Sequence, residues 1–185
     1  MASIISEKLY TYQDYKNLDV DDNFWYELIN GELVQKSSPS PNHQRISRKL
    51  LLQMVAFVEE NQLGEVFYAP IDVFLDNHNA PQPDLVFVST GKKALVTDDG
   101  IMEPPDLVVE IISPSSVKRD RMDKMRLYGK HRIPEFWLID PNNMSVEVYV
   151  FQEGDYGVFA LAAQTGTVQS GVLQGFSVDV QTLFG

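Results

Sequence analysis

Two acidic residues stand where a folded core should be apolar. Asp84 heads the apolar run 85–88. Glu110 interrupts a second apolar run, 107–112. A buried carboxylate is costly unless it is paired, hydrogen-bonded or bound to a metal. If the two runs are neighbouring strands, Asp84 and Glu110 can converge on a hard cation such as Mg²⁺ or Mn²⁺. The alternative is that Asp84 caps a turn while Glu110 pairs with a nearby Arg or Lys.

A cation for the same site is expected from the charged segment that follows. Asp120, Lys124 and Tyr128 recur every four residues, which places them on one face of a helix. The spacing alone also fits an ordinary Asp–Lys pair on a solvated helix, which would contribute little.

Other polar residues are accessory candidates. A two-residue Asn-Gly turn would pair Ile29 with Glu32, so Glu27 and Glu32 would share one face of a hairpin. Either could add a third carboxylate, or both could form the wet face, an alternative that we favour slightly for Glu27. His43 lies near a predicted helix start, where it could orient a phosphate or water, or simply make a local hydrogen bond. Gln82 and Tyr128 are candidates for supporting the site from behind.

The elements that position these residues follow from turn and helix signals. Thr11 and Asp14 predict a short helix near 12–18, and Asn30-Gly31 predicts a hairpin. Ser40-Pro41 opens a long amphipathic helix that ends after Asn61. The remaining predicted elements are strands over 65–75, 85–88, 107–112, 135–140, 146–150 and 157–163, a helix over 117–131, and a closing helix over 178–184. We therefore expect an α/β (α+β) fold with a mixed central sheet flanked by helices, an N-terminal hairpin and extra C-terminal strands.

Composition limits the possible classes of protein. The 185 residues suit one domain over 1–185. There are no cysteines, which excludes disulfides and thiolate metal sites and fits a cytoplasmic protein. The N-terminus does not read as a signal peptide, and no run is apolar enough to cross a membrane. With 26 acidic and 15 basic residues the net charge is −11, so nucleic acid would have to bind through a local patch or a metal.

A longer series of motifs resembles one family. Its members in this chain are YELINGELV at 26–34, SPNH at 40–43, QPDLVFVS at 82–89, DLVVEIISPSS at 106–116, the Asp120, Lys124 and Tyr128 series, and IPEFWLIDP at 133–141. The series resembles the Uma-two family of restriction endonucleases, within the PD-(D/E)xK nuclease-like superfamily. The resemblance implies a restriction-endonuclease-like core and Asp84 and Glu110 as the metal pair.

One position departs from the general nuclease pattern. Ile112 stands where the strand would carry the lysine, and the resemblance implies that Lys124 supplies the cation from the following helix. The implied activity is metal-dependent hydrolysis of phosphodiester bonds, with Mg²⁺ or Mn²⁺ as cofactor and DNA as the substrate. We expect Lys124→Ala to abolish cleavage with little effect on folding.

Two rival functions and one assembly state complete the expectations. The acidic composition and the missing in-strand lysine favour a catalytically inactive nuclease-fold module for binding or assembly. Hydrolysis of a different phosphate ester is a third possibility. A homodimer is expected, because aromatic strand faces around Trp137 and Tyr149 look exposed and double-strand cleavage benefits from two symmetric sites.

Overall fold

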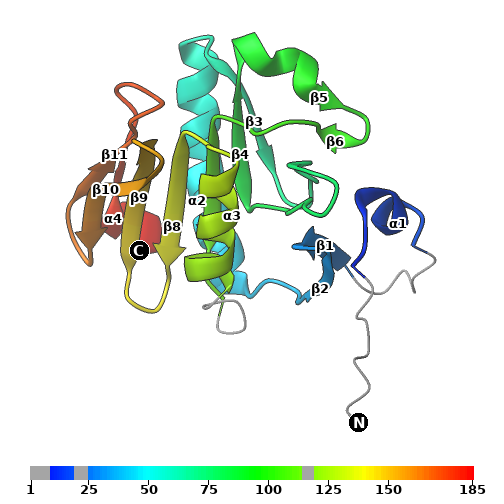
Figure 1. Cartoon of the computed structure of the whole chain (residues 1–185). Coiled ribbons are helices and arrows are strands. Elements are labelled where there is room, and N and C mark those ends of the chain that lie inside the picture. Colours follow the sequence, from blue (N-terminus) through cyan, green and yellow to red (C-terminus); the bar gives the residue numbers. More distant parts are fainter. Residues whose placement is uncertain (1–8, 19–24, 114–118) are drawn as a thin grey trace.

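A six-stranded mixed sheet forms the centre of the molecule (Figure 1). The computed structural model describes residues 9–18, 25–113 and 119–185. The strand order is β10-β9-β8-β7-β4-β3, and only the β7–β8 pair is parallel. The strands are β3 (Gly64–Tyr68), β4 (Leu85–Ser89), β7 (Leu107–Ile111), β8 (Glu135–Asp140), β9 (Ser145–Gln152) and β10 (Asp155–Ala163).

Helices cover both faces of this sheet, with α3 in front and α2 behind in the view of Figure 1. Helix α2 (Pro41–Glu60) buries Ile46, Leu50, Met54 and Val58 against one face. Helix α3 (Met125–Lys130) buries Leu127 and Tyr128 against the other. Alternate residues of the central strands serve the two cores, so the strands read as continuous apolar runs. The mixed α/β architecture is therefore as predicted.

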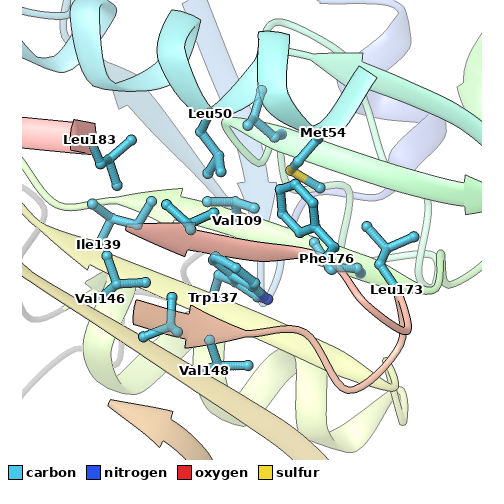
Figure 2. Close-up of a cluster of buried hydrophobic side chains, with 14 of the residues drawn as sticks. Leu50, Met54, Val109, Trp137, Ile139, Val146, Val148, Leu173, Phe176 and Leu183 are labelled. Atoms are coloured by element: carbon cyan, nitrogen blue, oxygen red, sulfur yellow. The ribbon is translucent and has the colours of Figure 1, made fainter. Parts of the chain in front are cut away.

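Trp137 corrects one expectation. Its side chain is fully buried, and Figure 2 shows it inside the cluster between α2 and the sheet, near Val109 and Phe176. Tyr149 is half-buried and stacks on Phe136. The exposed aromatic face that suggested a dimer is thus absent at Trp137.

The predicted N-terminal elements form for the reasons given by their sequence. Thr11 and Asp14 make a capping box at α1 (Tyr12–Lys16). Strands β1 (Trp25–Ile29) and β2 (Glu32–Lys36) pair across Asn30 and Gly31, whose φ angles of 51° and 77° are both positive, as a type I′ turn requires. Ser40 caps α2 by accepting a hydrogen bond from the His43 N–H at 3.2 Å.

Three segments differ from the prediction. Strand β3 ends at Tyr68, shortly before Pro70, which has no N–H to donate to a ladder, and within 71–75 only Val73 makes an isolated bridge, to Ile101. The connection after β4 contains η1 (Thr90–Leu95) and a small hairpin of β5 (Val96–Thr97) and β6 (Gly100–Ile101). A further hairpin, formed by β11 (Thr167–Gln169) and β12 (Ser177–Asp179), precedes the closing helix α4 (Val180–Phe184). Val168 and Val178 face each other in this hairpin and are fully buried, so packing favours a strand where a helix was expected.

The charged helix expected over 117–131 has two parts. Residues 114–118 lie outside the described chain. A π-helical segment, η2 (Arg119–Lys124), leads directly into α3. Short π-helical turns are rare and occur often at functional sites. None of the described helices is long and apolar enough to cross a membrane.

Candidate active site

Asp84 and Glu110 meet at one end of the β4–β7 pair. The two strands are antiparallel with Leu85 opposite Val109, and the Asp84 N–H donates to the Val109 carbonyl at 3.0 Å. Asp84 immediately precedes β4, and its Oδ2 accepts the Ile111 N–H, so its side chain lies beside the residue that follows Glu110. The Glu110 side chain points to the face of β7 that carries α3, because Val109 and Ile111 point to the α2 side. The two acidic residues are therefore close together at one end of adjacent strands.

Glu110 is held by the helix that packs over it. Its side chain is 4% exposed, and Lys124 Nζ donates to Oε1 at 2.9 Å and to Oε2 at 3.0 Å. The Tyr128 hydroxyl donates to Oε1 at 2.5 Å. Lys124 and Tyr128 lie one helical turn apart, so both reach the same carboxylate. Lys124 therefore places a positive charge beside Glu110, although position 112 of the strand is an isoleucine.

A second buried carboxylate contacts the same lysine. Glu27 on β1 is 1% exposed, and its Oε2 lies 3.0 Å from Lys124 Nζ and accepts the Gln82 N–H at 3.2 Å. Burial alone would raise the pKa of Glu27, but the positive charges of Lys124 and Lys36 outweigh it and lower that pKa. The ammonium of Lys124, itself 2% exposed, therefore lies between two buried carboxylates.

Asp84 has a different set of partners. Its Oδ2 accepts the Ile111 N–H at 2.7 Å and lies 3.3 Å from His43 Nε2. Burial would raise the pKa of Asp84, but the contact with His43 and the charge of Lys36 lower it. Burial would likewise lower the pKa of His43, yet the Asp84 carboxylate raises it above its ordinary value. No described residue donates a hydrogen bond to Asp84 Oδ1, which leaves that atom available to a ligand.

Lys36 is a site residue that the sequence reasoning missed. Its Nζ donates to the Gln82 carbonyl at 2.6 Å, and its charge acts on Glu27 and Asp84. The signal was present in the hairpin register. Because β2 pairs Val34 with Glu27, every second residue of β2, including Lys36, shares the face of Glu27.

Some of the accessory candidates contact the site and others do not. Glu27, His43 and Tyr128 join the site through the contacts above, and Gln82 does so through its backbone. The Gln82 side chain donates instead to Asp72 at 2.8 Å and to Tyr15 at 3.2 Å.

Glu32 is exposed and makes no contact with the site, so the preference for Glu27 as the wet residue of the hairpin was wrong. The two positions differ in surroundings rather than in face: Glu27 pairs in mid-strand, whereas Glu32 begins β2 at the turn. Asp120 falls within η2, but its side chain lies outside what the structure describes.

The donor set fits a small divalent cation. Among the described residues, no group of three or more His, Asp or Glu has metal-site geometry. Mg²⁺, however, is often bound through one or two carboxylates, with water and substrate phosphate completing the shell. Asp84 and Glu110 supply two hard oxygen donors at one end of the β4–β7 pair.

This mixed sheet between helices, with paired acids on adjacent strands and a lysine beside them, defines a restriction-endonuclease-like protein. The chain belongs to the Uma2 family, described as "Putative restriction endonuclease", whose model matches residues 12–181. The resemblance found in the sequence is confirmed.

One relative and one solved structure are similar to most of the chain. The uncharacterized protein sll1609 of Synechocystis sp. is 22% identical over 151 residues, which are 80% of this chain and 85% of the relative. The crystal structure of a "putative nuclease belonging to DUF820" from Anabaena variabilis superposes with a TM-score of 0.75 at 21% identity, covering 94% of this chain and 97% of the other. At that identity the likeness shows the fold.

Proposed function

We propose that the chain is a divalent-metal-dependent endonuclease that acts as one domain and hydrolyses phosphodiester bonds in DNA. The observation that supports the proposal is that Asp84, Glu110 and Lys124 lie at one end of the β4–β7 pair. Asp84 accepts the N–H of the residue that follows Glu110, and the Lys124 ammonium lies 2.9 Å from the Glu110 carboxylate. Membership of the family described as "Putative restriction endonuclease" supports the same class of reaction.

In this proposal Asp84 and Glu110 hold Mg²⁺ or Mn²⁺. Such a cation polarises a phosphoryl oxygen and lowers the pKa of bound water. Lys124 stabilises the negative charge that develops on the phosphate during the reaction. Glu27 keeps the lysine charged and oriented, because its own pKa is lowered and it remains ionised. His43, whose pKa is raised by Asp84, adds a partial positive charge at the edge of the site.

A cleavage assay with matched variants tests this function. Plasmid, linear DNA and RNA are incubated with the protein in Mn²⁺, in Mg²⁺ and in EDTA. Asp84→Asn and Glu110→Gln should abolish metal-dependent cleavage, whereas Glu32→Gln, a carboxylate change on the exposed hairpin, should leave it intact. Calorimetric titration of Mn²⁺ should show binding that both site variants lose. Cleavage that survives in Asp84→Asn would remove this site from the mechanism.

One observation favours a second candidate. Lys124 already neutralises both oxygens of Glu110, so the buried cluster is satisfied without a metal. A catalytically inactive module for binding or assembly is therefore the rival proposal. It predicts neither cleavage nor Mn²⁺ binding that depends on Asp84 and Glu110.

A homodimer also remains a proposal, now with a different surface. Since Trp137 is buried, the exposed apolar residues of the edge strand β10 are the better candidates: Val158, Phe159 and Leu161 are 63%, 51% and 63% exposed. A monomeric mass by light scattering at micromolar concentrations would contradict it.

A further inference from the structure

Helix α2 concentrates positive charge in the half that lies nearest the site. Arg45, Arg48 and Lys49 fall within its first nine residues, whereas its acidic residues, Glu59 and Glu60, end it. The helix begins beside Asp84, because His43 in its first turn lies 3.3 Å from that carboxylate. The positive end of the helix dipole points the same way. In a chain of net charge −11, this is a local reversal of sign.

Two of these residues have free charges, in contrast to most cations of the protein. Arg45 and Arg48 are exposed, and neither forms an ion pair or a hydrogen bond with any described residue. Lys49 is used otherwise, since its Nζ donates to the Thr182 carbonyl at 2.9 Å. Carboxylates neutralise five of the described surface cations elsewhere, namely Lys16, Lys92, Lys93, Arg121 and Lys130, whereas Arg126 and Arg132 form no ion pair with a described residue.

The two arginines lie on the outer face of α2, near the end of the helix that borders the site. Arg45 and Arg48 are three residues apart and so share a helical face, which at about 100° per residue is the side away from His43 and from the buried residues of α2. At about 1.5 Å per residue, they lie roughly 3 Å and 8 Å beyond His43 along the helix axis. Guanidinium groups bind phosphate through two parallel hydrogen bonds, which suits a polyanionic backbone better than a single ion.

We propose that the exposed face of α2 at Arg45 and Arg48 is a phosphate-backbone track, which holds the flanking nucleic acid on the outer side of the helix, near the end that borders the site. This inference rests on the proposed function and adds how an acidic protein retains a polyanion. It predicts a contribution to binding that does not depend on base sequence, because phosphate contacts position the nucleic acid without reading it.

The test measures how binding depends on salt. Fluorescence anisotropy of a labelled duplex is followed over a KCl series, with Ca²⁺ as the divalent ion. Each phosphate contact contributes about 0.9 to the slope of log K against log salt, so Arg45→Gln/Arg48→Gln should lower the slope by about 1.8. At 0.1 M salt this corresponds to roughly 60-fold weaker binding, with the two curves converging near 1 M. With a single-stranded probe, the same double variant should lower the slope by about 1.4.

Arg132→Gln is the matched control. Arg132 is also exposed, but it precedes β8, about 10 Å or more along the sheet from Leu138, the neighbour of Glu110. Its replacement should leave the slope unchanged, and thermal melts should confirm that all variants fold. An unchanged slope in the double variant, an equal loss in Arg132→Gln, or no binding by the unmodified protein would overturn the track. Loss of the slope in a protein that cleaves nothing would support the track and contradict the nuclease.

Discussion

Lys124 is the residue whose removal should change the protein most. Its ammonium is buried and lies 3.0 Å from Glu27 and 2.9 Å from Glu110, so Lys124→Met leaves two carboxylates without their cation. Removing one partner of a buried ion pair costs about 3 to 5 kcal/mol of unfolding free energy. In a chain of this size that loss lowers Tm by about 6 to 20 °C. Because Lys124 is buried, we now expect Lys124→Ala to destabilise the fold as well, contrary to the expectation from the sequence.

Urea unfolding of four proteins separates this effect from ordinary loss of packing. They are the unmodified chain, Lys124→Met, Glu27→Gln and the double variant. Glu27→Gln removes one of the two carboxylate charges that Lys124→Met leaves without a cation. The double variant should therefore lose less free energy of unfolding than the sum of the losses in the two single variants. Strictly additive values would show that the lysine and Glu27 do not interact.

The pH dependence gives a second, independent measure. In the unmodified chain the pKa of Glu27 is lowered, so its stabilising effect is present above the pKa of the unfolded chain, about 4.3, and is lost as pH falls below it. In Lys124→Met burial acts without the main opposing charge and raises the pKa of Glu27 relative to its value in the unmodified chain. The variant should therefore retain more of its pH 7 stability in acid than the unmodified chain does. A Lys124→Met protein within about 1 kcal/mol of the unmodified one at pH 7 would refute the reasoning.

Further predictions concern the partners of the site and the core. The raised pKa of His43 implies stability that is complete below about pH 6.5 and lost as pH rises through the folded-state pKa, so His43→Gln should flatten the stability profile above pH 6.5 in thermal melts. Tyr128→Phe removes the hydroxyl donor to Glu110 and should cost about 1.5 to 3 kcal/mol in urea unfolding, and no measurable change would contradict that bond. Glu135→Ala should exceed about 3 kcal/mol, because the buried carboxylate accepts from Trp137, Ser170 and the backbone of 171–172.

Local signals predicted the elements that carry the site. The caps at Thr11 and Ser40 and the Asn30-Gly31 turn act over a few residues, and each forms as expected. The apolar runs around Asp84 and Glu110 predicted central strands, because a strand that is buried on both faces consists almost entirely of apolar residues. These features need no knowledge of the rest of the chain.

The partners of the site depend on tertiary packing and were harder to predict. The place of Glu27 follows from how the hairpin docks, with the Leu28 N–H donating to the Ala80 carbonyl at 3.2 Å, and no local pattern encodes that contact. Burial of Lys124 depends equally on the packing of η2 and α3 over the sheet. Its candidacy came from the family resemblance, since helical spacing alone also fits a solvated pair. The β11–β12 hairpin was missed because its short strands gain their stability from the core they cover.

In the proposed site the lysine comes from a helix and not from the strand, which has a consequence for how such a site can change over generations. Position 112 is now occupied by an isoleucine that is 3% exposed and packs in the core beneath α3. Returning a lysine to that position would put a second cation beside Lys124 and remove apolar packing at the same time. Removing Lys124 first would leave the Glu27 and Glu110 carboxylates without the ammonium that they contact. Each single substitution is therefore expected to destabilise this chain. Paired substitutions should cross between the two arrangements more readily, and a chain with the helical lysine is expected to keep it.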